Sequence, residues 1–170
     1  IWNRKINSVS KKIDFFVKLL LDQHLFRVKS TIKRQVLDVD MLGSFLAAFK
    51  YKDTADQAVA FRDVLEDLSS PLPMDRLLCG DVGFGKTEVA IRACFVSVIT
   101  GMRVIVLAPT TILCYQLFDS FLNRLKPFAI NVQMVSRLNT KSDVENTISN
   151  FNSGKTDVIV CTHRIFTYMS

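Results

Sequence analysis

Apolar positions recur at helical spacing through the first part of the chain. In residues 6–35 the apolar stripe predicts one amphipathic helix, with the lysines largely off the stripe; it is formed by Ile13, Phe16, Val17, Leu20 and Leu21. Residues 36–53 are less regular, and Gly43 favours a break in this segment. The N-terminal region is therefore expected to be helical.

A second helix is expected from Thr54 to about Leu68, because proline at position 71 cannot continue it. Apolar runs and helical patterns then alternate. Strands are expected at 77–80, 103–108, 132–136 and 157–161, and helices at 86–99, 111–125 and from Ser142, with a Ser142–Glu145 capping box, to Gly154. This order predicts an open α/β fold with a parallel sheet and right-handed crossovers.

A glycine-rich octet lies between the first expected strand and the helix that follows it. Its sequence, GDVGFGKT, fits the phosphate-binding P-loop; it comprises Gly80, Asp81, Val82, Gly83, Phe84, Gly85, Lys86 and Thr87, with Glu88 next. Backbone N–H groups of such a loop cradle phosphate oxygens, and the start of the helix adds positive charge. Lys86 is expected to reach the β and γ phosphates, and the Thr87 hydroxyl to bind Mg²⁺. The sequence therefore predicts a site for ATP and Mg²⁺. Ligands of an open α/β sheet bind beyond the carboxyl ends of its strands, so this loop is expected to share one sheet edge with residues 108–111, 136–137 and 162–164.

Composition is typical of a folded protein without a membrane span. Hydrophobic residues make up 49% of the 170 residues, and no run reaches the roughly 20 apolar residues of a membrane helix. The four cysteines form no C-x-x-C pair, which favours reduced, buried thiols in a cytoplasmic protein. We expect a soluble protein with no membrane partner.

The net charge of +6 is concentrated in the first 40 residues, which carry nine Lys or Arg and four Asp. Nucleic acid attracted to this basic segment is one interpretation, and the solvated face of a helix is the other. Charge alone leaves both open.

Four segments together resemble superfamily 2 DNA translocases, specifically the first motor lobe of the bacterial transcription-repair coupling factors (Mfd). They are residues 73–93, 107–113, 135–138 and 160–166. RecG-like branch-migration helicases are the nearest alternative, but these usually carry Ser at the position of Phe84 and Glu at that of Thr111. The resemblance implies a RecA-like motor lobe over residues 49–170, preceded by a helical linker over 1–48.

The resemblance also assigns nucleotide contacts. It implies that Gly83, Gly85, Lys86 and Thr87 hold the triphosphate and Mg²⁺, and that Thr54, Asp56 and Gln57 recognise adenine. An aromatic residue upstream packs on the base in this family, and Tyr51 is the first choice, with Phe49 second. Thr54 and Gln57 also fit a capping box, which needs no nucleotide, and the two roles are compatible.

A second group of residues is assigned by the resemblance to the phosphates of double-stranded DNA: Pro109, Thr110, Thr111, Arg137, Thr162 and His163. A helix N-cap at Thr110 or Thr111 and an ordinary turn at Thr162 are the alternatives without a DNA role.

The 170 residues contain no Asp-Glu-x-Gln box, the motif that orients the attacking water in this family. The lobe is therefore expected to be incomplete at its C-terminus, and the chain alone to be inactive in hydrolysis. RNA polymerase and nucleotide-excision repair proteins are implied partners of parts absent from this chain. A truncated, non-catalytic remnant that only binds nucleotide is the alternative.

Overall fold

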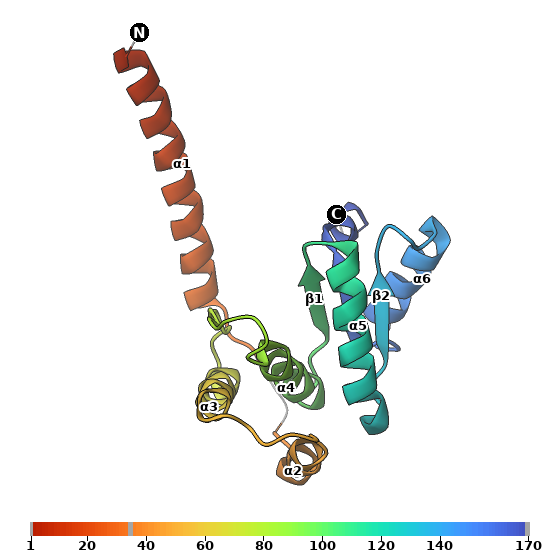
Figure 1. The fold of residues 1–170 in the computed structure, drawn as a ribbon. Helices are drawn as coiled ribbons and strands as arrows, with labels where there is room; N and C mark the ends of the chain where they lie inside the picture. The colour runs from red at the N-terminus through yellow and green to blue at the C-terminus, as the bar shows by residue number, and fades with distance from the viewer. Residues whose placement is uncertain (1, 34–35, 169–170) are drawn as a thin grey trace.

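The computed structural model describes residues 2–33 and 36–168, with side chains from residue 12 onward. Four helices come first: α1 (Trp2–Lys29), α2 (Val39–Ala47), α3 (Ala55–Ser69) and α4 (Lys86–Ile99) (Figure 1). Strands and helices then alternate as β1 (Val104–Ala108), α5 (Thr111–Leu125), η1 (Lys126–Phe128), β2 (Val132–Val135), α6 (Lys141–Asn152), β3 (Val158–Thr162) and η2 (His163–Thr167). In the part of the chain with described placement, no helix has both the length and the apolar character that crossing a membrane requires.

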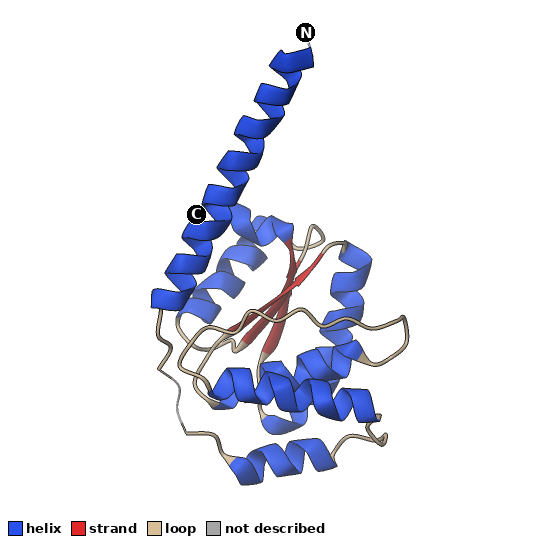
Figure 2. Cartoon of the chain, turned by 90° about the vertical axis from the view of Figure 1, so that its left-hand side faces the viewer, coloured by secondary structure: helices blue, strands red, loops and turns tan. Residues whose placement is uncertain are grey.

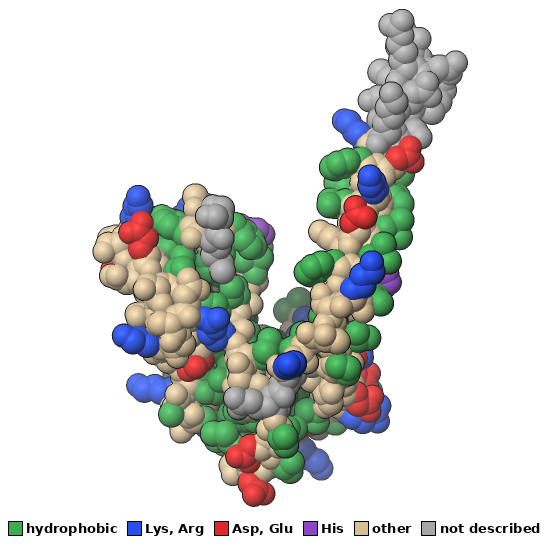
Figure 3. Space-filling view, turned by 180° about the vertical axis from the view of Figure 1, so that it is seen from behind, with side chains coloured by type: hydrophobic (Ala, Val, Ile, Leu, Met, Phe, Trp, Pro, Cys, Tyr) green, Lys and Arg blue, Asp and Glu red, His purple; other side chains and the backbone are tan. Residues whose placement is uncertain are grey.

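Helix α1 extends away from the rest of the molecule, with its C-terminal end at the body (Figures 1 and 2). Its predicted apolar stripe is solvent-exposed, with exposed fractions between 48% and 63%, and Figure 3 shows hydrophobic and charged side chains mixed along the helix. Near its base, Arg27 forms an ion pair with Asp75, and the Ile32 amide donates to the Pro71 carbonyl at 2.8 Å. The predicted helix is confirmed, but it ends at Lys29 rather than near residue 35.

The sheet has three parallel strands in the order β1-β3-β2 (Figure 2). Val158 of β3 is in register with Val104 on one side and Val132 on the other. Helix α5 connects β1 to β2, and α6 connects β2 to β3, so each crossover carries a helix as a parallel sheet requires. The predicted α/β class with a parallel sheet is confirmed.

Alternate residues of β3 enter two different apolar clusters. Val158 and Val160 pack with residues of α4 and α5, whereas Ile159 and Cys161 pack with α6 and η2. Both faces of this central strand are therefore buried, which explains its continuous β-branched sequence. On β1, by contrast, Ile105 and Leu107 are exposed, so the strand predicted as buried is covered on one face only.

Helices α2 and α4 are joined through aromatic packing. The rings of Phe45 and Phe95 are stacked with centroids 3.8 Å apart, and Phe128 packs edge-on against both. Phe45 and Phe95 are fully buried. This contact attaches the helical N-terminal region to the α/β unit.

Three local expectations were wrong. Residues 77–80 form no strand, and Leu77 is 87% exposed, because no strand in the described chain pairs with this segment. Gly43 does not break the chain but lies inside α2, whose N-cap Asp38 accepts from the Met41 amide. The capping box of α6 is formed by Thr140 and Asp143, two residues before the predicted pair.

Candidate functional site

The P-loop begins α4 in a conformation suited to an anion. Gly83 and Gly85 have φ values of +84° and +73°, in the left-handed region that favours glycine. No side chain caps the start of α4, so its first N–H groups are open to a ligand. The Lys86 ammonium donates to the carbonyl oxygens of Gly80 at 2.6 Å and Asp81 at 2.5 Å. The glycine conformations and the uncapped start of α4 fit a triphosphate. The Lys86 side chain is folded back onto carbonyl groups of its own loop.

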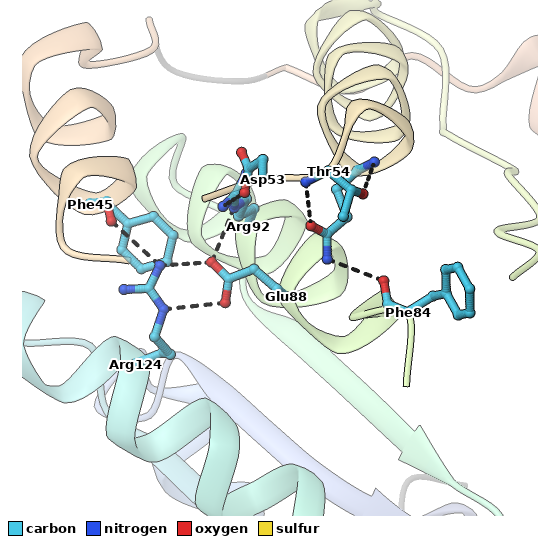
Figure 4. Close-up of polar contacts among 8 residues, drawn as sticks. Phe45, Asp53, Thr54, Phe84, Glu88, Arg92 and Arg124 are labelled. Carbon is cyan, nitrogen blue, oxygen red and sulfur yellow. Dashed lines mark hydrogen bonds and ion pairs between the residues drawn. The ribbon is translucent and has the colours of Figure 1, made fainter. Parts of the chain in front are cut away.

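Gln57 connects the expected adenine segment to the P-loop. Its amide nitrogen donates to the Phe84 carbonyl at 3.1 Å, while its side-chain oxygen accepts from the Thr54 amide at 3.0 Å (Figure 4). The Thr54 hydroxyl accepts from the Gln57 amide at 3.2 Å, so the predicted capping box is present. The cap and the loop contact occur together, and the Gln57 side chain therefore fixes the distance between α3 and the P-loop.

A cavity of about 990 Å³ lies between the adenine segment, the P-loop and α5. Most of the predicted nucleotide contacts line it; these are Tyr51, Thr54, Gln57, Val82, Gly83, Phe84, Gly85, Thr87 and Glu88, together with Phe49. Gly80, Asp56 and Lys86 line a smaller adjoining space beside Gln57. Tyr51 is exposed, with its ring 5.6 Å from that of Phe49, so either aromatic is available to a base.

Thr87 is the side chain expected to bind Mg²⁺ here. Thr87 lines the large cavity, and no group of three or more His, Cys, Asp or Glu able to hold a metal occurs among the residues with described positions. One hydroxyl plus phosphate oxygens and water is an arrangement that Mg²⁺ accepts.

An ion cluster of Asp53, Glu88, Arg92 and Arg124 borders this cavity, and Glu88 and Arg124 line it (Figure 4). Arg92 is buried, donates to both oxygens of Asp53 at 2.7 Å, and donates to Glu88 at 3.0 Å. Arg124 donates to the two oxygens of Glu88 at 2.7 and 3.3 Å. Two positive and two negative charges balance, which a buried cluster needs.

Glu88 therefore has a structural role that its position beside the P-loop did not reveal. Its carboxylate is bonded to two guanidinium groups from α4 and α5, and Arg124 also donates to the Phe45 carbonyl at 3.4 Å. Phe49 lies 5.0 Å from the Arg92 guanidinium carbon and 5.3 Å from that of Arg124, within cation–π range. The cluster thus joins α2, the adenine segment, α4 and α5.

The hydrogen bonds from Arg92 lower the pKa of Asp53, and the positive charge of Arg92 adds to this effect against a smaller opposing effect of burial. Asp53 is thus held ionised beside the nucleotide cavity.

The predicted DNA-binding residues lie together at the carboxyl ends of the strands. Pro109, Thr110, Thr111, Arg137, Thr162 and His163 all line one cavity of about 360 Å³, with Ile112 and Arg164. Arg137 and His163 are exposed, as a phosphate contact requires. Thr110 also caps α5, because its hydroxyl accepts from the Leu113 amide at 3.2 Å, so the simpler role predicted for it is present as well.

Arg164 holds the loop that carries Arg137. Its guanidinium donates to the carbonyl oxygens of Ser136 at 3.0 Å and Asn139 at 3.1 Å, and contacts the Tyr168 hydroxyl at 3.2 Å. This residue follows His163 directly, so one side chain of η2 fixes the loop after β2.

The P-loop does not join the other three segments at one sheet edge, contrary to the expectation that all four converge. The loop lines a cavity with the C-terminal half of α5, whereas Thr110 and Thr111 at the start of that helix line the 360 Å³ cavity. Figure 1 shows α4 near the lower end of α5. Because residues 77–80 form no strand, no ladder holds the loop at the carboxyl edge of the sheet.

Three of the four cysteines are buried, as expected, but Cys79 before the P-loop is exposed. Burial raises the pKa of the Cys94 and Cys161 thiols to about 12, so both stay protonated at neutral pH. The buried thiols therefore act as small apolar residues.

Sequence reasoning missed several polar residues in and around the nucleotide cavity: Asp53, Arg92, Asp119, Asn123 and Arg124. The i,i+4 spacing of Glu88 and Arg92 was the single local signal available. The other pairs join residues 36 to 39 positions apart, which no local pattern indicates.

A family model for DEAD/DEAH box helicases matches residues 54–170. The chain belongs to the DEAD/DEAH box helicase family. The transcription-repair-coupling factor of Bacillus subtilis is 37% identical over 168 residues, and that of Borreliella burgdorferi is 39% identical over 166. Each alignment covers 96% of this chain but only 14% and 15% of the relative. The resemblance to coupling factors is thus confirmed.

A solved structure of RecG bound to a three-way DNA junction superposes with a TM-score of 0.79 at 28% identity. The match covers 86% of this helicase-family chain and 20% of that protein. It confirms the RecA-like α/β fold.

Proposed function

We propose that the chain is the nucleotide-binding part of the first motor lobe of an ATP-dependent double-stranded DNA translocase. The observation that carries this proposal is the 990 Å³ cavity, which brings the P-loop and the expected adenine segment together. In this proposal Lys86 and the N–H groups at the start of α4 bind the phosphates, Thr87 binds Mg²⁺, and Gln57 with Tyr51 or Phe49 binds adenine.

DNA binding is proposed for the second cavity, through phosphates rather than bases. Its hydroxyl groups, its guanidinium and the start of α5 suit phosphate oxygens, which carry no sequence information. Binding is expected to be independent of sequence and to weaken steeply with salt. A tenfold or greater preference for one DNA sequence at physiological salt contradicts this.

We infer that the complete protein is a cytoplasmic coupling factor that displaces stalled RNA polymerase and acts with nucleotide-excision repair proteins. Support comes from the coupling factors, at 34% to 39% identity, against 28% for the RecG structure. A RecG-like helicase lobe is the alternative, and full-length protein distinguishes them: release of stalled polymerase supports the coupling factor.

Hydrolysis is expected to need residues that this chain does not carry. The P-loop holds phosphates and one side of Mg²⁺, but the 170 residues include no Asp-Glu-x-Gln box. Glu88 is not free to replace it, because two arginines occupy its carboxylate. We therefore expect no DNA-stimulated ATPase from residues 1–170 alone.

The decisive test measures Mg-ATP binding by the chain and its Lys86→Ala variant with calorimetry. Loss of the ammonium, which contacts phosphate in this proposal, is expected to weaken binding at least tenfold. Lys155→Ala is the control, because it removes an exposed lysine that lines neither the large cavity nor the space beside Gln57. Equal affinity of wild type and Lys86→Ala would overturn the assignment. Turnover by 1–170 that Lys86→Ala removes would show that a carboxylate near the loop replaces the box.

A further inference from the structure

Helix α5 contributes a polar wall to the nucleotide cavity that neither the P-loop nor the adenine segment supplies. Asp119, Ser120, Asn123 and Arg124 all line the cavity. Asp119 and Asn123 are four positions apart on a helix, so their side chains lie on one face, one turn apart. A carboxylate and an amide therefore border the same part of the cavity.

Both of these groups are available to a ligand. Within residues 2–33 and 36–168, neither the Asp119 carboxylate nor the Asn123 amide forms a hydrogen bond or an ion pair. The neighbouring groups are already bonded: the Ser120 hydroxyl donates to the Gln116 carbonyl at 2.9 Å, and Arg124 is paired with Glu88. The wall thus offers a ligand the Asp119 carboxylate, which accepts hydrogen bonds, and the Asn123 amide, which both donates and accepts them.

The charge of Asp119 restricts which part of a nucleotide it can face. A carboxylate repels phosphate oxygens, so the triphosphate belongs on the opposite side, with Lys86 and the start of α4. The remaining donors of ATP are the two ribose hydroxyls and the adenine amine. Gln57, the proposed adenine contact, is bonded to the P-loop at the Phe84 carbonyl rather than to α5. With the base held by Gln57 and the phosphates by the P-loop, the ribose hydroxyls are the donors left for the α5 wall.

We propose that Asp119, assisted by Asn123, binds the ribose hydroxyl groups and makes this site select ribonucleotides over deoxyribonucleotides. An acidic side chain that accepts hydrogen bonds from vicinal ribose hydroxyls is a recurring solution in dinucleotide-binding folds. The inference rests on the proposed nucleotide binding, and it adds the residue that recognises the sugar.

Calorimetric titration of the chain with Mg-ATP and Mg-dATP tests the proposal. A hydrogen bond to a charged group contributes about 1.5–3 kcal/mol, so wild type is expected to bind ATP at least about tenfold tighter than dATP. Asp119→Ala is expected to lower ATP affinity to the dATP value and remove the preference. Asp119→Asn is expected to keep part of it, because an amide oxygen still accepts a hydrogen bond.

Gln116→Ala is the matched control, since this exposed side chain lies on α5 but outside the cavity wall. It is expected to bind both nucleotides like wild type. If Asp119→Ala fails to fold, the affinities of the wild-type chain for 2′-deoxy-ATP and 3′-deoxy-ATP still test the proposal, because each analogue lacks one ribose hydroxyl.

The outcomes separate this inference from the proposed function. If wild type binds ATP and dATP equally, the sugar contact is wrong although nucleotide binding stands. If Asp119→Ala weakens ATP and dATP by the same factor, the carboxylate faces the base, and the sugar assignment is overturned. If wild type binds neither nucleotide, the proposed function itself fails.

Discussion

The two cavities are held in place by different kinds of interaction. The DNA cavity follows the ends of β1, β2 and β3, whose positions are set by backbone ladders on both sides of the central strand. The nucleotide cavity follows a segment with no strand, and side chains hold it: Gln57 on the Phe84 carbonyl, and the ion cluster of Asp53, Glu88, Arg92 and Arg124.

This difference predicts where single substitutions act. A ladder is made of many equivalent backbone bonds, so no one side chain determines the position of the β3 end. The ion cluster instead depends on four charges, and removal of one leaves its partners uncompensated. The nucleotide cavity is therefore expected to be sensitive to side-chain substitution, and the frame of the DNA cavity to be tolerant.

The largest effect is expected from Arg92→Ala. Removing this guanidinium, which is 3% exposed, leaves Asp53 unpaired and Glu88 with one partner, and breaking a buried pair typically costs about 3–5 kcal/mol of the free energy of unfolding. Urea denaturation measures the loss. Arg62→Ala is the control, since Arg62 is 64% exposed and its pairs with Asp63 and Glu66 contribute about 0–1 kcal/mol. Similar losses in the two variants would contradict the comparison.

A smaller effect, confined to one cavity, is expected from Gly85→Ala. The left-handed φ of Gly85 costs an alanine about 1–2 kcal/mol, and its Cβ would lie 2.1 Å from the Gln57 amide nitrogen. Gln57 would have to leave the Phe84 carbonyl, so Mg-ATP affinity is expected to fall.

Gly154→Ala separates the two causes. Gly154 has a similar φ of +78° with nothing within 4 Å of an added Cβ. It is expected to lose comparable stability while Mg-ATP affinity, measured by calorimetry, stays unchanged. Equal loss of affinity in both variants would show that backbone strain, not Gln57, controls the site.

The fold was predictable where a short segment determines its own environment. Residues 157–161 have a β-branched sequence that fits burial on both faces, and β3 is found there. Residues 77–80 have a similar apolar run but no partner strand, and pairing is a property of distant segments that a local pattern cannot show. The residues proposed to contact DNA line one cavity for a related reason, because they follow the ends of predicted strands; their DNA role came from the family resemblance alone.

The ion cluster was not predictable, because polar residues on a helix normally face water. Arg92 lies on α4 in a pattern that an exposed helix face would also show, and its partner Asp53 is 39 positions away. The wall formed by Asp119 and Asn123 depends equally on where the end of α5 lies relative to the P-loop. Both the ion cluster and the α5 wall depend on how segments distant in the sequence are placed relative to one another.

The DNA cavity is expected to respond through charge rather than stability. Arg137→Ala removes one exposed guanidinium, so the slope of log affinity against log salt is expected to decrease by about one, with little change in unfolding free energy. Fluorescence anisotropy with duplex DNA over a salt series measures the slope. Lys155→Ala, an exposed lysine that does not line this cavity, is the control. An unchanged slope for Arg137→Ala would remove Arg137 from the phosphate site.

The smallest effect is a pH dependence that arises in the ion cluster. Because Arg92 lowers the pKa of Asp53, the folded state binds this proton less readily than the unfolded state, whose pKa is near 3.8. The stabilisation is complete above that value and is lost as pH falls through the lower folded value. Asp53→Asn should reduce the acid-side slope of unfolding free energy below about pH 4. An unchanged slope would mean that the Asp53–Arg92 pair contributes little.

The projecting helix α1 has a mechanical consequence. At 1.5 Å per residue, its 28 residues form a rod of about 42 Å that is tied to the body near one end by Arg27 and Asp75. Rotation by about ten degrees at that end moves the other end by roughly 7 Å, because displacement grows with length. Asp75 lies eleven residues before Lys86 in the sequence, so the anchor of this lever and the P-loop share one short segment. A small movement of that segment would be amplified along α1.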